Sequence, residues 1–330
     1  MIHGMTVPRR VAPLLLLAIA GQAQPAGSFD AFLAGVRREA QSGGVSANTL
    51  NRAFAGIRPN ERVLELDRRQ AEFTQSWEGY RDGRLSQTRL DAGRRAYADN
   101  RALLQQVQTR TRVSARTIMG IWGLETNYGG FTGNFNVIEA LATLAWDGRR
   151  AAFFRAELLA ALRILDGGHI APERMRGSYA GAMGQPQFMP TSFERLAMDF
   201  DGDGRRDIWD NRADALGSIG NYLARNGWRE GESWGFEVVL PAGFDAGYAE
   251  PSRPRPAAEW PSLDQWARLG VRRADGGSLG TGSGAIIIPA NQERGQQAFM
   301  ALPNFHAIRR YNPSTFYALT VGMLGDLVAR

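Results

Sequence analysis

Three aspartates alternate with other residues in segment 199–210, which reads DFDGDGRRDIWD, and a glycine follows the third of them. Oxygen ligands at loop positions one, three and five, with glycine at the sharp turn, suit a hard cation of high coordination number. The spacing predicts an EF-hand-type calcium loop. Such a loop needs a helix on each side, so it requires a short helix over Ser192–Met198 and another that begins near Ala213.

The ligand that closes this loop is left open by the sequence. At position twelve, Asp210 stands where a bidentate glutamate is usual, and Asp214 lies four residues later. The alternative to a metal site is an Asp/Gly turn that caps a helix. The predicted calcium ligands are Asp199, Asp201, Asp203, the backbone carbonyl of Arg205, and Asp210 or Asp214.

The hydrophobic pattern is mainly helical from Phe29 to Asn226. Ser46 and Asn48 supply capping chemistry for one helix, and Ser114 caps another that carries Ile118 to Trp122. The longer helices are expected over 85–107 (one long or broken helix), 149–165, 213–226 and, near the C-terminus, 314–328.

The pattern changes after Trp228. Phe236–Leu240 and Ala285–Ile288 are β-branched or aromatic runs bounded by proline and glycine, which predicts strands. Between them, Pro241–Pro261 is rich in proline and glycine and is expected to be an irregular surface segment. The fold class expected is therefore α+β, predominantly α, with small β elements in the C-terminal part.

The N-terminus has the pattern of an export signal. Arg9 and Arg10 precede an apolar run over Val11–Ala20, and small residues up to Ala23 offer cleavage sites. The run is too short to cross a bilayer as a mature helix, and no later stretch is long and apolar enough to do so. A buried N-terminal helix is the alternative. We expect residues 1–23 to be removed and the rest to be a soluble exported protein.

Cysteine and lysine are both absent. This excludes disulfides, thiolate nucleophiles, thiolate metal sites and a lipid anchor on cysteine, and it also excludes a lysine Schiff base. The net charge of +6 is carried by arginines that are spread along the chain. Because they form no dense run, nucleic-acid binding is not expected, whereas an acidic polymer remains a plausible partner.

One glutamate lies in a setting suited to acid catalysis. Glu125 ends an apolar helical segment in the sequence WGLETNYG, with Trp122 and Tyr128 on either side. Desolvation there would raise the pKa of its carboxyl group into the range that a general acid uses. A buried, salt-bridged glutamate is the alternative.

The segment Gly177–Pro190 has the composition of a ligand-binding turn. Its small residues let the backbone approach a ligand closely, Ser178, Gln185 and Gln187 supply hydrogen bonds, and Tyr179 and Phe188 supply flat faces suited to sugar rings. A tightly packed glycine turn is the alternative.

Other catalytic interpretations are weaker. His169 and His306 lie outside any metalloprotease motif, and isolated histidines are more often structural. Gly280–Gly284 resembles a nucleotide-binding loop, but its apparent strand follows the glycines instead of preceding them. No organic cofactor is therefore expected.

Taken together, these motifs resemble the lytic murein transglycosylase B family. WGLETNYG, GSYAGAMGQPQFMPTSF, the aspartate loop, GSIGNYLARNGW and LPNFHAIRRYNPSTFYA occur in family order over about Phe29–Arg330. The resemblance implies a lysozyme-like, α-rich catalytic domain with small β elements. It also implies periplasmic cleavage of the glycan strands of peptidoglycan, with a structural calcium ion.

The resemblance also assigns residues. Glu125 matches the catalytic acid/base, and the aspartates of the loop, with Arg205, match calcium ligands. Two departures are Gln185-Pro186, where tyrosine–glycine is found in a well-known member, and one extra residue between Asp210 and Asp214. The expected substrate-binding residues are Ser178, Gln187, Phe188, Tyr222, Tyr311, Asn312, Tyr317 and the pair Arg149 and Arg150.

The expected organisation has four segments. Residues 1–23 form the signal peptide and 24–112 an N-terminal helical part. Residues 113–235 form the lysozyme-like core, with the calcium loop at 199–214, and 236–330 complete the glycan groove.

A single carboxylate limits the mechanism. Ordinary glycosidases use two carboxylates, but only Glu125 has a suitable setting, unless Glu139 or Asp147 comes close to it in space. If Glu125 is alone, the N-acetyl group of the substrate can stabilise the cationic centre and the C6 hydroxyl of the sugar can attack it. The product is then a 1,6-anhydromuramoyl end. The alternatives are a lysozyme-type muramidase that uses water and a non-catalytic, calcium-stabilised peptidoglycan-binding protein.

Overall fold

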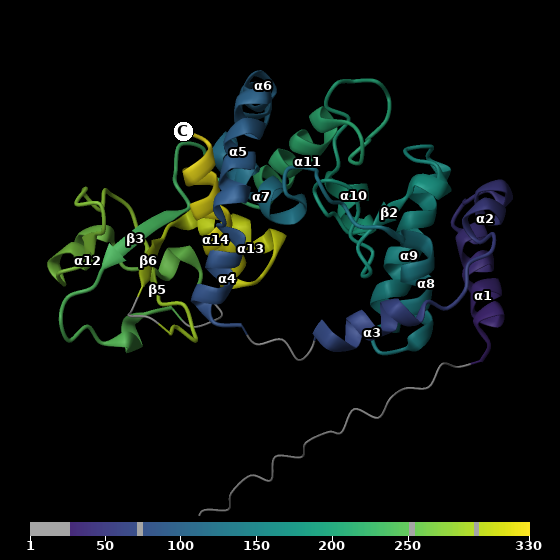
Figure 1. Ribbon diagram of the computed structural model, residues 1–330, viewed down its shortest axis with the longest axis horizontal. Helices are drawn as coiled ribbons and strands as arrows, with labels where there is room; N and C mark the ends of the chain where they lie inside the picture. The colour runs from purple at the N-terminus through teal and green to yellow at the C-terminus, as the bar shows by residue number, and fades with distance from the viewer. Residues whose placement is uncertain (1–26, 71–74, 251–254, 294–296) are drawn as a thin grey trace, which may run out of the picture.

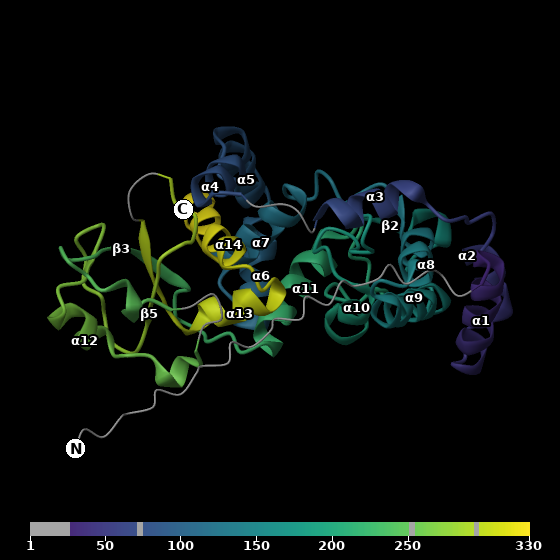
Figure 2. The same ribbon diagram turned by 90° about the horizontal axis from the view of Figure 1, so that it is seen from below.

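The computed structural model describes residues 27–70, 75–250, 255–293 and 297–330. The molecule is elongated, with α1 and α2 at one end and a small sheet at the other (Figures 1 and 2). The predicted signal peptide, 1–23, lies outside the described residues, as do residues 251–254 of the predicted irregular segment. Nowhere in these four ranges is there a helix with the length and hydrophobicity needed to cross a membrane.

One end of the molecule is a helical unit built from two distant parts of the sequence. Its helices are α1 (Phe29–Ser42), α2 (Ala47–Ala53), α3 (Glu61–Gln70), α8 (Val137–Asp147), α9 (Ala151–Asp166) and α10 (Pro190–Leu196). The first three helices pack against α8 and α9 around Leu50, Leu141 and Leu162. The predicted cap Ser46 is confirmed, since its side chain accepts a hydrogen bond from Thr49 N, whereas Asn48 lies inside α2.

The centre of the molecule is a second helical unit. It contains α4 (Trp77–Arg84), α5 (Gln87–Asp99), α6 (Arg101–Thr111), α7 (Ala115–Thr126), α11 (Arg212–Arg225), α13 (Pro303–Tyr311) and α14 (Thr315–Val328). The helix expected over 85–107 is broken at Asn100, which ends α5 and begins α6. Gly120 lets α7 approach α14 closely, because a Cβ there would lie 2.1 Å from the carbonyl oxygen of Val321.

The β structure at the other end is an antiparallel sheet in the order β4-β3-β6-β5. Its strands are β3 (Gly235–Val239), β4 (Arg272–Arg273), β5 (Ala285–Ile287) and β6 (Ala298–Ala301). Met300 of β6 pairs with Phe236 on one side and Ile286 on the other. The two predicted strands are confirmed as β3 and β5; β4 is too short, and β6 (AFMA) too poor in β-branched residues, to give a strand signal.

The remaining elements are short. β1 (Phe135–Asn136) pairs antiparallel with β2 (Arg176–Gly177), and α12 (Leu263–Arg268) packs against the sheet. Single turns of 3₁₀-helix lie at Pro172–Arg174, Ala246–Tyr248 and Ala257–Glu259. The expected class, α+β and predominantly α, is confirmed.

The hydrophobic cores group the chain differently from the four expected segments. Helices α1 to α3 share a core with α8 to α10, whereas α4 to α6 share one with α7, α11 and α14. Tyr311 packs against both cores, so it lies where the two helical units meet. The segment boundaries at 112/113 and 235/236 stay predictions.

Candidate active site

Helix α7 carries Glu125 to the surface of the central core. Ser114 caps its start, and the helix is buried from Thr117 to Gly123. It ends just after Glu125, because Asn127 and Tyr128 take left-handed backbone conformations with φ of 49° and 61°. Left-handed residues end a helix, so Glu125 lies in the last turn, where its side chain is partly accessible to solvent.

The environment of Glu125 favours the protonated acid. Burial raises the pKa of its carboxyl group from 4.5 to about 7, and a hydrogen bond from Tyr317 opposes this shift. The Tyr317 hydroxyl donates to Glu125 Oε1 at 2.6 Å. Burial also raises the pKa of Tyr317 well above 10, so this hydroxyl keeps its proton and stays a donor. A carboxyl group with a pKa near neutrality can give and take a proton at physiological pH.

No acidic side chain contributes to the raised pKa of Glu125, within the part of the chain that the structure describes. The two candidates named from the sequence have partners elsewhere. Glu139 accepts a hydrogen bond from Asn60 Nδ2 at 2.7 Å, and Asp147 pairs with Arg68. Among the described residues, burial and not a neighbouring negative charge raises the pKa of Glu125.

Three aromatic side chains, here called the aromatic group, lie between the two helical units. Phe188, Tyr222 and Tyr311 pack with their rings tilted by about 50° at ring-centroid distances of 4.5 to 5.8 Å. Phe188 is buried, whereas the two tyrosines are partly exposed. Their two hydroxyls donate to backbone carbonyls, Tyr222 to Arg310 O and Tyr311 to Pro186 O, each at 2.6 Å. The charge of Glu125 acts on the pKa of Tyr311, so the group lies close to the carboxyl. Three predicted substrate-binding residues are thereby brought together.

The glycine-rich turn positions Ser178 and Gln187. Ser178 Oγ accepts a hydrogen bond from Ala182 N at 3.0 Å, which leaves its hydroxyl proton available to another acceptor. Gln187 has a left-handed backbone with φ of 53°, and its Nε2 donates to Thr132 O and Gly184 O. Among the described residues, no donor reaches the side-chain oxygen of Gln187, so this oxygen can accept a hydrogen bond from a ligand.

The interpretation of Gln185 as a ligand-binding side chain is wrong. Gln185 is buried, its Oε1 accepts from Trp122 Nε1 at 3.0 Å, and its Nε2 donates to Trp209 O at 3.0 Å. Its backbone carbonyl accepts from Thr126 Oγ1. Gln185 instead ties the turn to the end of helix α7. Its side chain reaches Trp122, three residues before Glu125, and its carbonyl reaches Thr126, the next residue after Glu125.

Asn312 lies at the turn between α13 and α14. Its Oδ1 accepts a hydrogen bond from Ser314 N at 3.0 Å, and Ser314 caps α14. The side chain of Asn312 therefore shapes the start of the helix that carries Tyr317. Asn312 and Tyr317 therefore lie on either side of the N-cap of α14.

The predicted substrate-binding pair Arg149 and Arg150 is held by one carboxylate. Asp67 of α3 is 3% exposed and forms ion pairs with both arginines. Arg149 also donates to the backbone carbonyl of Asp67 at 2.9 Å. Both arginine side chains remain nearly half exposed, and their charges act on the pKa of Tyr179 in the glycine-rich turn. The pair therefore lies beside that turn in a fixed orientation.

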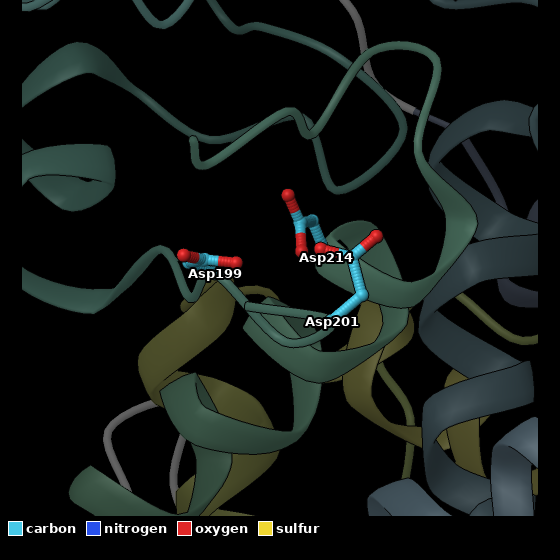
Figure 3. Close-up of side chains that lie close together, drawn as sticks. All are labelled: Asp199, Asp201 and Asp214. Atoms are coloured by element: carbon cyan, nitrogen blue, oxygen red, sulfur yellow. The ribbon is translucent and has the colours of Figure 1, made fainter. Parts of the chain in front are cut away.

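Three aspartates of the predicted calcium loop come together. Figure 3 shows Asp199, Asp201 and Asp214, whose carboxylate oxygens lie within 4.8 Å of one another. Asp214 is fully buried and accepts from Phe200 N and Asp207 N at 2.7 Å. Burial raises the pKa of Asp214, and the charges of Asp201 and Asp199 add to that shift. Two carboxylates beside a third, buried one are a donor set that fits a hard divalent cation.

The other predicted calcium ligands are placed differently. Asp203 accepts a hydrogen bond from Arg205 N at 2.8 Å and pairs with its guanidinium group, and it is not part of the three-aspartate cluster. Asp210 is exposed and forms an ion pair with Arg174. The geometry therefore favours Asp214 over Asp210 as the closing ligand, because only Asp214 faces Asp199 and Asp201.

Sequence reasoning missed Asp67 and Tyr80. Tyr80 of α4 packs on Phe316 at 5.6 Å, Arg84 lies over its ring, and Glu125 acts on its pKa. Trp77, Tyr80 and Arg84 share one face of α4, a spacing that could have identified a ligand-binding helix face. The two histidines are structural, as expected: His169 accepts from Arg206 N, and His306 stacks on Trp260.

Comparison with known proteins places the chain among enzymes. The profile of the family described as transglycosylase SLT domain matches residues 28–326. Membrane-bound lytic murein transglycosylase B of Escherichia coli (strain K12) is 37% identical over 223 residues, 66% of this chain and 57% of that protein. The chain thus matches little more than half the length of this relative.

Solved structures agree with the profile. SltB3 from Pseudomonas aeruginosa, in complex with NAG-anhNAM-pentapeptide, is 45% identical with a TM-score of 0.85, over 91% of this chain and 79% of that one. The Escherichia coli lytic transglycosylase Slt35, in complex with calcium, is 30% identical with a TM-score of 0.75, over 91% of this chain and 92% of that one.

Proposed function

The chain belongs to the transglycosylase SLT domain family, with its lysozyme-like fold, and on that premise we propose that it is a lytic murein transglycosylase. It cleaves the β-1,4 bond between N-acetylmuramic acid and N-acetylglucosamine in the glycan strands of peptidoglycan. The observation that carries the proposal is Glu125, whose carboxyl group has a pKa of about 7 with no contribution from another described carboxylate, and which lies near the aromatic group. Aromatic faces suit sugar rings, and the carboxyl group suits proton transfer to a glycosidic oxygen.

In the first step, Glu125 acts as a general acid. Its proton passes to the bridging oxygen as the bond from that oxygen to C1 of the muramic acid breaks. The electron pair of the broken bond stays with the leaving sugar. The N-acetyl oxygen of the muramic acid stabilises the cationic C1, a role that the second carboxylate has in ordinary glycosidases. Tyr317 then stabilises the new carboxylate of Glu125 through its hydrogen bond.

In the second step, Glu125 acts as a general base. It accepts the proton of the C6 hydroxyl as this oxygen attacks C1 of the same sugar, and a 1,6-anhydromuramoyl end results. No water enters, and Glu125 regains its proton for the next cycle. The absence of an acidic neighbour acting on Glu125 supports this path, because nothing else near it, among the described residues, would activate a water molecule.

The substrate-binding roles follow from position. Tyr222 and Tyr311 are partly exposed and supply ring faces, and the buried Phe188 packs against both of them. Ser178 supplies a donor and Gln187 an acceptor. Asn312 and Tyr317 line the side formed by the turn between α13 and α14. Arg149 and Arg150, held by Asp67, present their exposed faces to the glycan or to its acidic peptide.

A murein zymogram tests the assignment. The wild-type protein should clear the murein, whereas Glu125→Gln should bind sacculi without clearing them. A wild type that binds sacculi but clears nothing would favour the non-catalytic binding protein. An active Glu125→Gln protein would remove Glu125 from the mechanism.

We also propose that the aspartate loop holds a structural calcium ion. Asp199, Asp201 and Asp214 supply carboxylates, with Asp203 and the carbonyl of Arg205 completing the set of loop ligands. Asp214 closes the site. The buried position of Asp214, next to two like charges and with no ion pair among the described residues, supports a cation there.

Calcium should therefore stabilise the folded protein. At a concentration about 100 times its Kd, a ligand that binds only the folded state adds about 2.7 kcal/mol. The melting temperature should rise with calcium relative to chelator. Magnesium should have a smaller effect, because it demands near-octahedral geometry and gives up its bound water reluctantly. Asp214→Asn should lose the response, whereas Asp210→Asn should keep it. The same melting curve with calcium and with chelator would favour the metal-free turn.

Finally, we propose that residues 1–23 direct export and that the mature protein is a soluble protein of the periplasm. The arginine pair and apolar run at the N-terminus support this. Fractionation of cells that express the chain should place it in the periplasmic extract, with a mature N-terminus near residue 24. Retention in the cytoplasm at full length would contradict the proposal.

A further inference from the structure

Glu157 of α9 is a buried carboxylate to which the mechanism assigns no part. It is 3% exposed, and it forms no ion pair in the part of the chain that the structure describes. Both of its oxygens contact one residue of α10. Oε2 accepts a hydrogen bond from Thr191 N at 2.9 Å, and Oε1 accepts one from Thr191 Oγ1 at 2.8 Å. Burying a carboxylate without a cation costs stability, so a gain in function would account for its place here.

Thr191 lies directly after the glycine-rich turn of the candidate active site. It is the second residue of α10, which begins at Pro190. Phe188 lies three residues before Thr191, and Gln187 lies four residues before it. Pro190 has a fixed φ and also restricts the backbone of the residue that precedes it. Because this connection is short and stiff, the position of Thr191 limits where the two side chains can lie.

The glycine-rich turn is held from both helical units. Gln185 accepts a hydrogen bond from Trp122 Nε1 of α7 at 3.0 Å, which ties one side of the turn to the central unit. Glu157 ties the other side to α9, which belongs to the helical unit at the end of the molecule. The segment between these two anchors, 186–190, carries two of the predicted substrate-binding side chains.

The two side chains of this segment contribute in different ways. Gln187 has a side-chain oxygen that no described donor reaches, so it can accept a hydrogen bond from a ligand. Phe188 is buried and packs against Tyr222 and Tyr311 at ring-centroid distances of 5.6 and 5.8 Å. A shift of the segment would therefore move both a hydrogen-bond acceptor and the support of the two tyrosine rings.

We propose that Glu157 is a positioning residue for substrate binding. By holding Thr191 at two atoms, it fixes the end of the glycine-rich turn and so keeps segment 186–190 in place. The inference rests on the proposed function and deepens it, because it names a contact outside the candidate active site on which binding of the glycan depends. Glu125 is carried by α7 and held by Tyr317. Loss of the contact should therefore weaken binding and leave proton transfer nearly unchanged.

A second contact between α9 and α10 supplies a matched control. Arg163 of α9 pairs with Glu194 of α10, and its Nε and Nη2 donate to the two carboxylate oxygens at 2.6 and 2.8 Å. This pair is partly exposed and lies about one helical turn beyond Thr191. Glu194→Ala loosens the same two helices by the same change of side chain, but it leaves both contacts of Thr191 in place.

Calorimetry measures binding without turnover. The ligand is a murein tetrasaccharide whose stem peptides an amidase has removed, and every variant also carries Glu125→Gln. Glu157→Ala should weaken binding by about tenfold, because the turn is no longer preorganised, and Glu194→Ala should change it by less than about twofold. Glu157→Gln should stay within about threefold of the parent, since its oxygen can accept from Thr191 N and its amide nitrogen can donate to Thr191 Oγ1. Melting curves check that each variant is folded.

Three results would overturn the proposal. They are an unchanged affinity of Glu157→Ala, an equal loss for Glu157→Ala and Glu194→Ala, and a Glu157→Gln variant that binds as weakly as Glu157→Ala. Should Glu157→Ala not fold, Thr191→Val decides, because it removes only the contact at Oγ1 and keeps the shape of the side chain. Thr191→Val should weaken binding by about threefold. An unchanged affinity of this variant would equally contradict the role of Glu157.

Kinetics separate positioning from a loss of folded protein. In the enzyme that retains Glu125, acting on soluble, uncrosslinked peptidoglycan strands, Glu157→Ala should raise KM by about tenfold and keep kcat within about twofold. A smaller folded fraction lowers kcat at an unchanged KM, and that result would overturn the positioning role. The proposed function is judged separately, by murein clearing with the wild-type protein. If the wild type clears no murein, the calorimetry still decides the role of Glu157.

Discussion

Replacement of Glu125 by glutamine should make the protein more stable, by an amount that depends on pH. The folded state raises the pKa of this carboxyl group from 4.5 to about 7. Its folded-state pKa lies above its unfolded value, so the unfolded chain ionises first as the pH rises. The wild-type protein therefore keeps its full stability below about pH 4.5 and loses part of it up to about pH 7. Glutamine does not titrate and escapes this loss.

The magnitude follows from the shift. Each pKa unit corresponds to about 1.4 kcal/mol, so the free energy of unfolding of the wild type falls by about 3 kcal/mol across this window relative to the variant. Glutamine fills nearly the same volume and can still accept the hydrogen bond of Tyr317, so packing changes little. A loss of stability of this size is expected at a residue that is retained for function and not for stability.

Urea unfolding at pH 5, 6, 7 and 8 measures the difference. The stability gain of Glu125→Gln over the wild type should grow with pH and level off above the pKa of Glu125. Asp147→Asn is a useful control, because it removes a carboxylate that pairs with Arg68 at the surface. A gain that is constant over this pH range would refute the argument that burial raises the pKa of Glu125.

Three further changes test other residues of the candidate site. Tyr317→Phe removes the hydrogen bond that lowers the pKa of Glu125, so the alkaline limb of the kcat/KM profile should move up by about one pH unit, while Tyr222→Phe should leave it in place. An alkaline limb at the same pH as in the wild type, or at a lower pH, would contradict this role of Tyr317. Asp67→Asn should lower the free energy of unfolding in urea by about 2 kcal/mol, because it removes a buried charge shared by two arginines. An unchanged urea midpoint would show that the ion pairs of Asp67 with Arg149 and Arg150 do not stabilise the fold. Gln185→Ala should lower the free energy of unfolding in urea by about 3 kcal/mol, because it leaves Trp122 Nε1 and Trp209 O without their hydrogen-bond partner. A decrease of less than about 1 kcal/mol would show that the turn does not depend on this side chain.

The sequence predicted those features that depend on residues adjacent to one another in the chain. Ser46 and Ser114 were identified as helix caps because an N-cap depends on a few adjacent residues, and both cap in the structure. The setting of Glu125 was also visible, because its aromatic neighbours lie within three residues of it. The strand β6 was not visible, since AFMA pairs with β3 and β5 only in the folded sheet.

Contacts between distant segments could not be read from the sequence. Gln185 and Gln187 look alike as side chains beside glycines, but only the folded chain brings Trp122 and Trp209 to Gln185 and turns it inward. The choice between Asp210 and Asp214 likewise depends on the direction in which α11 begins.

The partner of the arginine pair could not be identified from the sequence either. Arg149 and Arg150 were identified through their resemblance to a family motif, whereas their carboxylate partner, Asp67, lies 82 residues away from Arg149. Nothing near Asp67 in the sequence marks it as a partner. Its role depends on the packing of α3 against α8.

The central claim is that Glu125 works alone and that the C6 hydroxyl of the substrate replaces water. Digestion of murein sacculi in oxygen-18-labelled water, followed by mass spectrometry of the muropeptides, tests it most directly. We predict 1,6-anhydromuramoyl ends that lack the label. Reducing ends that contain oxygen-18 would show that water attacks C1 and would contradict the transglycosylase mechanism in favour of a lysozyme-type muramidase.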